Sequence, residues 1–244
     1  MGTELELPKD YRSAFDKYVE KRRKGRKMKD LPDLRAFDLQ KFIFLYEEMK
    51  DMLDNYERYD ETDWQKRIME IVKLLYPQYI YAIRETKLTE MYGKGKRVDF
   101  VVINSSGYVD IIEIKDPKVG ILATYNGHLV KDRNNYVPSR YLGNTVAQVE
   151  NYIFGLNADN KNAVNKIKNH FSNTGTPLPD TLRLKILNPR GLIIMGRSNT
   201  EDEEILNSIE LLRRQYSHIV DIITYDDLID RLCNIVDSLK CKDD

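Results

Sequence analysis

Apolar residues recur at helical spacing in five stretches of the chain, and this periodicity predicts five amphipathic helices. They cover residues 38–53, 61–75, 142–156, 203–216 and 225–239. Asp38 is placed to cap the start of the first helix, and Pro77 is placed to end the second. Trp64 falls within the apolar stripe of the second helix, so we expect it to lie in the hydrophobic core.

Segments rich in β-branched and aromatic residues alternate with these helices and predict six strands. They cover residues 79–88, 97–103, 108–115, 182–187, 191–195 and 219–224. A tight-turn sequence at 104–107 joins the second and third strands, with Gly107 available for a positive φ. We expect the fourth and fifth strands to form a pair around residues 188–190. The order of elements predicts an α/β domain over residues 59–244, preceded by a charged helical region at 1–58 that serves regulation or assembly.

Composition and charge exclude several classes of protein. A chain of 244 residues with 41% hydrophobic and 32% charged residues is globular, neither disordered nor collagen-like. Two cysteines and three histidines, scattered along the chain, exclude a disulfide framework and a structural zinc site. No apolar run approaches the ~18 residues of a membrane span, so we expect a cytoplasmic protein without a membrane partner. Basic and acidic residues balance at 39 each, and a basic run at 21–29 is either a solvated helix end or an arm that contacts phosphates.

Two acidic residues and one lysine come together on a hydrophobic hairpin over residues 98–115. Because side chains alternate between the two faces of a strand, Glu113 and Lys115 share one face. With a three-residue turn Asp99 lies opposite Glu113, and a bulge at Gly107 would move this register by about one residue. Two adjacent carboxylates repel each other unless a proton or a cation holds them together, and Mg²⁺ is the cation that best suits such oxygen ligands. The hairpin therefore predicts a magnesium site.

The spacing D-x(13)-E-x-K of these three residues resembles the signature of the PD-(D/E)XK phosphodiesterase superfamily. This resemblance implies a restriction-endonuclease-like α/β core, with a mixed central β-sheet flanked by helices. It also implies that Asp99 and Glu113 bind Mg²⁺, or Mn²⁺ as the alternative ion, with the carbonyl of Ile114 as a further ligand. Lys115 then orients or deprotonates the attacking water and offsets charge on the phosphate.

Two residues on neighbouring helices are candidates for the same site. Glu61 lies close to the apolar stripe of the 61–75 helix, and nucleases of this superfamily often supply a further acidic metal ligand from the preceding helix. The alternative for Glu61 is an acid that serves the helix dipole. Gln148 lies one turn from Tyr152 on the helix after the Glu113 strand, where it can hold a water or a phosphate oxygen. The alternative for Gln148 is a surface amide.

Five basic residues are candidates for contacts with DNA phosphates. Lys94, Lys96 and Arg97 alternate with glycines in a turn, which either contacts a duplex or keeps a sheet edge soluble. Arg133 and Arg140 lie within a long stretch at 117–143 that has no clear periodicity, and long loops of this kind are often functional. The alternative for these two is a pair of solvated loop arginines.

Six segments, in order along the chain, resemble the Shedu anti-phage nucleases of bacteria. They lie at 61–65, 97–100, 113–115, 147–152, 190–197 and 222–228. This resemblance covers about residues 60–235 and implies a metal-dependent DNase that acts against phage, usually as a homo-oligomer. It also implies that the N-terminal region is variable and senses or regulates.

Two other functions are compatible with the same residues. One is a nuclease of the same superfamily that serves restriction, transposition or repair, and that requires a specific sequence, a modified base or a partner subunit. The other is a catalytically silent module that binds nucleic acid and uses the acidic pair for structure. The silent module would bind no Mg²⁺ at millimolar concentrations.

Overall fold

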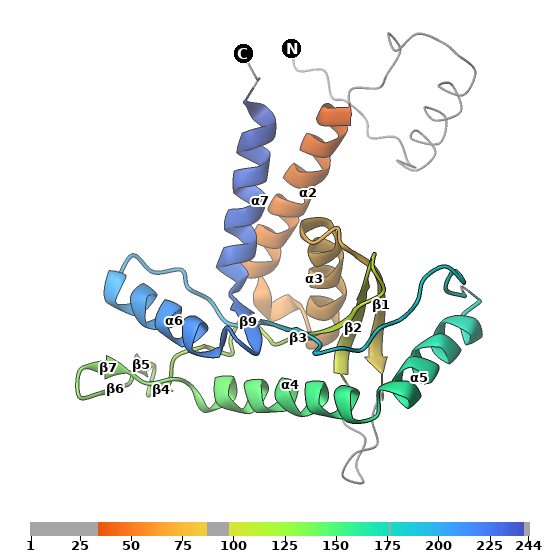
Figure 1. Ribbon diagram of the computed structural model, residues 1–244. Helices are drawn as coiled ribbons and strands as arrows, with labels where there is room; N and C mark the ends of the chain where they lie inside the picture. Colours follow the sequence, from red (N-terminus) through yellow and green to blue (C-terminus); the bar gives the residue numbers. More distant parts are fainter. Residues whose placement is uncertain (1–33, 87–97, 176, 242–244) are drawn as a thin grey trace, which may run out of the picture. The chain divides into compact units, whose positions relative to one another are not determined.

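A computed structural model describes residues 34–86, 98–175 and 177–241 (Figure 1). The chain divides into two compact units, one of residues 55–228 and one that combines residues 1–54 with 229–244. The described part of the second unit consists of α2 (Leu34–Asp54) and the portion of α7 (Tyr225–Lys240) that follows Leu228. The sequence-based boundary near residue 58 stays a prediction.

One sequence-based expectation in the second unit is wrong. Helix α2 begins at Leu34, so Asp38 does not cap its start. Asp38 lies one turn inside the helix, where its carboxylate accepts a hydrogen bond from the ammonium of Lys41 at 2.7 Å. An aspartate at i and a lysine at i+3 face each other on a helix, and this pairing is an alternative to capping.

The first unit is built on a five-stranded mixed sheet in the order β1-β2-β3-β8-β9. The strands are β1 (Tyr79–Thr86), β2 (Val98–Asn104), β3 (Val109–Ile114), β8 (Gly191–Ile194) and β9 (Val220–Ile223). The first three strands are antiparallel neighbours, whereas β8 and β9 run parallel to β3. This arrangement confirms the expected α/β class with a mixed central sheet flanked by helices.

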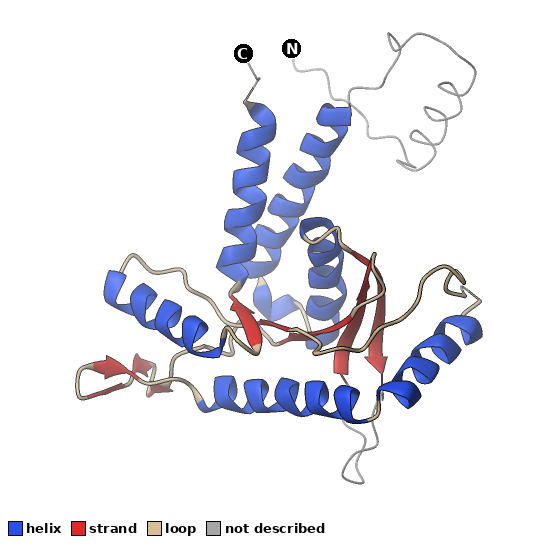
Figure 2. Ribbon diagram, viewed as in Figure 1, coloured by secondary structure: helices blue, strands red, loops and turns tan. Residues whose placement is uncertain are grey.

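Helices cover both faces of the sheet (Figure 2). Helix α3 (Glu61–Leu75) lies on one face, and α4 (Arg140–Ala158) and α5 (Asn160–Asn173) lie on the other. The central strand β3 is buried along its whole length, and its alternate side chains face opposite layers. Ile111 packs against α4 and α5 in one core cluster, so Glu113, two residues further along the strand, faces the same layer.

Helix α3 follows its sequence signals closely. Asp60 and Asp63 form a capping box, in which each carboxylate accepts a hydrogen bond from the main-chain N–H of the other. The helix ends at Leu75, two residues before Pro77, as expected. Trp64 is 1% exposed, which confirms its predicted place in the core.

The expected strand at 182–187 and its pairing with 191–195 are wrong. Strand β8 pairs with β3 and β9, and the only strand-like contact recorded in 182–187 among the described residues is a single parallel bridge between Lys185 and Tyr108. Asn188 has a φ of +47° and Pro189 has no N–H, so the extended chain is broken before β8. The alternating apolar residues of this segment instead cover the α5 side of the core.

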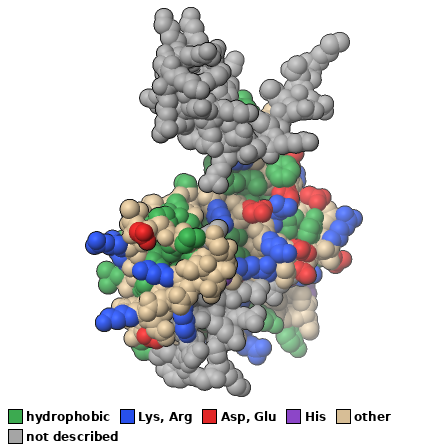
Figure 3. All heavy atoms as spheres, turned by 90° about the vertical axis from the view of Figure 1, so that its right-hand side faces the viewer, with side chains coloured by type: hydrophobic (Ala, Val, Ile, Leu, Met, Phe, Trp, Pro, Cys, Tyr) green, Lys and Arg blue, Asp and Glu red, His purple; other side chains and the backbone are tan. Residues whose placement is uncertain are grey.

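The connection between β3 and β8 contains elements that the sequence patterns do not predict. Helix α5 occupies part of the link between β3 and β8, and its Lys161 and Lys168 are exposed. On the face of the molecule shown in Figure 3, basic side chains are scattered among apolar and polar ones. The stretch after β3 forms four two-residue strands, namely β4 (Thr124–Tyr125), β5 (His128–Leu129), β6 (Lys131–Asp132) and β7 (Asn135–Tyr136). Helix α6 (Glu203–Tyr216) connects β8 to β9.

None of the helices in the described part of the chain combines the length and the apolar composition needed to cross a bilayer.

Candidate active site

Asp99, Glu113 and Lys115 lie together at the end of the β2–β3 hairpin. The strands pair from Ile103 opposite Val109 to Phe100 opposite Ile112, and Asp99 and Glu113 are the next residues beyond this last pair. The three-residue turn therefore produces the expected register without a shift. Asp99 comes from the start of β2, whereas Glu113 and Lys115 come from the end of β3 and the position just beyond it.

Hydrogen bonds fix the three side chains relative to the strand ends. The ammonium of Lys115 donates to Oε1 of Glu113 at 2.5 Å. The main-chain N–H of Ile114 donates to Oδ2 of Asp99 at 3.0 Å. The first contact joins Lys115 to Glu113, and the second joins Asp99 to the main chain between these two residues. The three side chains therefore form one group, which we call the acidic constellation.

The carboxyl group of Glu113 is held in an unfavourable environment for a negative charge. Its side chain is fully buried, and its Oε2 atom has no hydrogen-bond partner among the described residues. Burial and then the neighbouring charge of Asp99 raise the pKa of Glu113 to about 7, while Lys115 lowers it. A buried carboxyl of this kind gains stability from an additional cation.

Helix α4 brings an amide and a phenol close to the acidic pair. Gln148 is half-buried, and its side-chain N–H donates to the hydroxyl of Tyr152 at 2.7 Å. Burial raises the pKa of Tyr152 to about 12, and the charges of Glu113 and Asp99 also raise it, against the opposing effect of Gln148. Gln148 is thus hydrogen-bonded to a tyrosine whose pKa responds to the charges of Glu113 and Asp99. The sequence places Tyr152 one turn after Gln148, but this spacing does not predict a role for Tyr152 in the site.

A second tyrosine holds the main chain of Lys115. The N–H of Lys115 donates to the carbonyl of Ile194 on β8 at 2.9 Å, and its carbonyl accepts from the hydroxyl of Tyr225 at 2.6 Å. Tyr225 is fully buried and packs edge-on against Trp64, with 5.2 Å between ring centroids. Because Tyr225 lies 110 residues after Lys115, no local pattern could reveal this contact.

Tyr225→Phe should lower the free energy of unfolding by about 1–2 kcal/mol, because it keeps the ring but removes the hydroxyl that donates to the partly buried carbonyl of Lys115. Urea denaturation of the purified protein measures this loss. Tyr141→Phe is the matched control, since Tyr141 is 58% exposed. Equal stability of the two variants would contradict the assigned role of the Tyr225 hydroxyl.

The remaining predicted site residues lie elsewhere or outside the described residues. Glu61 is the first residue of α3, but its side chain is outside the described part of the structure. Lys94, Lys96 and Arg97 are also outside the described residues. Arg140 begins α4, about 12 Å along the helix axis from Gln148. Arg133 is exposed in the turn between β6 and β7.

The donors at the constellation fit a divalent oxygen-loving cation. Within residues 34–86, 98–175 and 177–241, no group of three or more His, Cys, Asp and Glu side chains is arranged to hold a metal ion. Asp99 and Glu113 nevertheless supply two carboxylates, and the buried Oε2 of Glu113 lacks a partner among the described residues. Hard oxygen donors, with remaining positions filled by water, are the ligand set that Mg²⁺ prefers.

The model of one known protein family, described as Shedu protein SduA, C-terminal, matches residues 58–229. The chain belongs to the Shedu family. No curated protein matches this chain. The Shedu family implies a role in anti-phage defence. The matched range contains Asp99, Glu113, Lys115, Gln148 and Tyr225, so the whole described constellation lies within the Shedu region.

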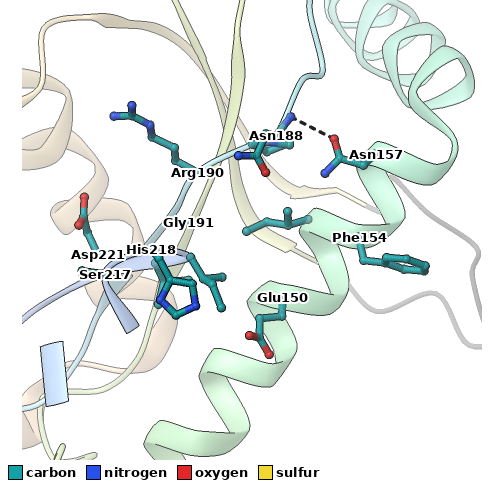
Figure 4. A pocket seen from close by; sticks show the side chains of 13 residues that line it. Glu150, Phe154, Asn157, Asn188, Arg190, Gly191, Ser217, His218 and Asp221 are labelled. Carbon is teal, nitrogen blue, oxygen red and sulfur yellow. Dashed lines mark hydrogen bonds between the residues drawn. The ribbon is translucent and has the colours of Figure 1, made fainter. Parts of the chain in front are cut away.

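A cavity of about 680 Å³ lies at the other end of the sheet in this Shedu protein (Figure 4). Gly191 and Val220, which begin β8 and β9, line it, whereas Lys115 follows the carboxyl end of β3. Figure 4 shows that the labelled side chains of Arg190 and Glu150 point in different directions. The cavity is therefore separate from the acidic constellation, and its charged groups do not converge on one point.

Proposed function

We propose that this Shedu protein is a metal-dependent DNA endonuclease that hydrolyses phosphodiester bonds in bacterial anti-phage defence. The observation that carries the proposal is the fully buried Glu113, which lies beside Asp99 and is hydrogen-bonded to Lys115. Burying charged groups lowers the stability of a protein, and charged side chains are therefore rare in buried strands. Two carboxylates and an ammonium at the end of the central strand indicate a functional site. We also propose that the mixed sheet with its flanking helices is a restriction-endonuclease-like core.

In this proposal Asp99 and Glu113 hold Mg²⁺, or Mn²⁺ as the alternative, together with the carbonyl of Ile114. When bound, the ion activates the attacking water and neutralises charge that develops on the phosphate. Lys115 places its ammonium beside Glu113, where it can orient the water and stabilise a phosphate oxygen. Gln148, restrained by Tyr152, presents its amide oxygen to a water molecule. Glu61 is proposed as a third carboxylate, from the start of α3.

The partners follow from the same proposal. The substrate is DNA of phage or plasmid origin, the protein acts in the bacterial cytoplasm, and copies of the chain assemble into a homo-oligomer. Lys94, Lys96 and Arg97 are proposed to contact the phosphates of the bound DNA, which is the contact that basic side chains in a glycine-containing turn make readily.

A cleavage assay on linear and supercoiled DNA, with Mg²⁺ or with EDTA, tests the proposal. The unaltered chain should cut in Mg²⁺ only, and Lys115→Ala should cut about 100-fold more slowly or not at all, because the water and the phosphate lose their nearest cationic side chain. Lys73→Ala, which removes an exposed lysine from the last turn of α3, is the matched control and should cut normally.

Cleavage by Lys115→Ala at the rate of the unaltered chain would reject the nuclease assignment. If the unaltered chain does not cut, a calorimetric Mg²⁺ titration separates the remaining cases. Binding that disappears in Glu113→Gln supports a gated nuclease, whereas absence of binding supports a silent module. Cleavage of one sequence only would favour restriction over general defence.

A further inference from the structure

The segment that links Lys115 to α4 forms an exposed arm, which we define as residues 123–137. It consists of two hairpins, one of β4 and β5 and one of β6 and β7, which branch from a common base. At this base, main-chain hydrogen bonds of 2.8–3.0 Å connect Ala123, Val130 and Val137 to one another. Figure 1 shows the arm extending beyond the start of α4. The arm is therefore an ordered element, although its sequence has no periodicity.

Both hairpin turns use left-handed backbone conformations. Asn126 and Gly127 have φ values of +49° and +79°, which suit these residue types. Arg133 and Asn134 occupy the corresponding places in the second turn with φ values of +47° and +68°. An arginine is disfavoured at positive φ, whereas asparagine or glycine would fit there without penalty. The turn places the exposed guanidinium of Arg133 at the tip of the second hairpin.

Contacts with the rest of the unit restrain the arm. The ammonium of Lys131 donates to Glu204 of α6 at 2.6 Å and lies 4.3 Å from the centre of the Tyr136 ring. At the base, Ser139 caps α4 and its hydroxyl also bonds to the carbonyl of Gly120 at 2.6 Å. These contacts restrain the hairpin that carries Arg133. A restrained hairpin loses less conformational entropy when it binds a ligand.

The position of the arm links it to the acidic constellation. Its first residue follows Lys115 by only eight positions, and its last is followed two residues later by the Ser139 cap of the helix that carries Gln148. A ligand that reaches the constellation along the start of α4 would pass Arg140, the first residue of that helix. The arm thus connects the end of β3, next to Lys115, to the start of the helix that carries Gln148.

The arm and the chain on either side of it carry more basic than acidic residues. Basic and acidic residues balance at 39 each in the chain, whereas residues 117–141, which extend beyond the arm at both ends, contain four basic residues and one acidic residue. They are Lys118, Lys131, Arg133, Arg140 and Asp132. Lys131 is paired with Glu204, and the ammonium of Lys118 lies 4.6 Å from the centre of the Tyr56 ring. Arg133 and Arg140 are therefore the two cations that we assign to an external anion. An extended polyanion complements this distribution.

We propose that the arm binds duplex DNA beside the cleavage site, with Arg133 and Arg140 on its phosphates. This inference rests on the proposed nuclease function and names the surface that holds the substrate. A two-stranded β-ribbon is narrow enough to enter the major groove, and phosphate contacts at its turn set the position of the duplex. The exposed polar side chains of the two hairpins then face the base edges.

Fluorescence anisotropy with a labelled duplex, and with a single strand of the same sequence, tests this inference. Binding is measured with Mg²⁺ in the Lys115→Ala background, so that the DNA is not cut. Adding Arg133→Asn should weaken duplex binding about 3–10-fold and reduce the slope of log affinity against log salt by about 1, because one phosphate contact is lost. The effect on the single strand should be smaller. Chemical denaturation should show unchanged or higher stability, because asparagine suits the turn.

Arg214→Gln is the matched control, since Arg214 is a highly exposed arginine of α6 outside the arm. Equal duplex affinity of Arg133→Asn and Arg214→Gln would overturn the arm proposal and leave the nuclease proposal standing. Failure of the unaltered chain both to bind and to cut duplex DNA would overturn both. A change in oligomeric state with unchanged duplex affinity would overturn the DNA assignment and identify the arm as a contact between copies.

Discussion

Glu113→Gln should lower metal-dependent DNA cleavage by roughly 1,000-fold or more, and it should also stabilise the metal-free protein. The loss of activity follows from the removal of a charged metal ligand, since a catalytic cation contributes several kcal/mol to transition-state stabilisation. The gain in stability follows from the burial of Glu113 next to Asp99. Glutamine keeps the acceptor for Lys115 but removes the repulsion between the two carboxylates.

The pH dependence of stability has a defined sign. In the metal-free protein the pKa of Glu113 is raised from 4.5 to about 7, first by burial and then by the charge of Asp99. Between these values the folded chain keeps a proton that the unfolded chain has released, so the free energy of unfolding falls as the pH rises through this window. The total fall is on the order of 3 kcal/mol, since one pKa unit corresponds to about 1.4 kcal/mol. Glu113→Gln does not ionise and should lack this fall.

Urea denaturation in EDTA from about pH 4.5 to about pH 8, together with the cleavage assay, measures both effects. Glu150→Gln is the matched control, because it neutralises an exposed glutamate of α4 two residues beyond Gln148. A variant of Glu113 that is less stable than the unaltered protein at about pH 8 would show that the Lys115 ion pair outweighs the repulsion from Asp99.

Gly107→Ala should lower the free energy of unfolding by about 3 kcal/mol or more. Gly107 has a φ of +84°, where a Cβ costs about 1–2 kcal/mol. A Cβ there would also lie 2.1 Å from the carbonyl oxygen of Arg183, which is main chain and cannot rotate away, so the backbone must shift. The turn at Gly107 sets the register that brings Asp99 opposite Glu113, so cleavage should fall together with stability.

Gly127→Ala is the control that separates the two contributions. Gly127 has a similar φ of +79°, but a Cβ there would meet nothing within 4 Å. Its loss of stability should therefore be limited to the backbone contribution of about 1–2 kcal/mol. Urea denaturation of both variants gives the comparison. Equal losses would mean that the close approach to Arg183 is relieved at no cost.

Local signals account for much of the predicted architecture. Helices α3 and α6 have the predicted bounds, because an apolar stripe at helical spacing and an acidic cap are properties of a few adjacent turns. The hairpin of β2 and β3 was also predicted, because a tight turn and alternating side chains determine its register. The grouping of Asp99, Glu113 and Lys115 follows directly from that register.

Other elements depended on contacts that the sequence patterns do not show. Helix α5 was not predicted, although Ala163, Ile167 and Phe171 recur every four residues, because polar residues dominate the rest of the segment. Strand β8 was assigned to the wrong partner, since an apolar run does not reveal whether its neighbour is adjacent in the chain or lies beyond a helix. The sequence does not predict the arm, because strands of two residues are too short to show a periodic pattern.

The class of the fold, the hairpin with its acidic pair and lysine, and the resemblance to the Shedu family can be inferred from the amino-acid sequence, because each is encoded within short segments or in their order. The surroundings of that hairpin cannot be inferred in this way. The influence of the carboxylates on the pKa of Tyr152, the hydrogen bond from Tyr225 to the carbonyl of Lys115, and the burial that raises the pKa of Glu113 involve elements distant in the chain. Such contacts depend on how helices and strands pack, and packing is a property of the whole folded unit.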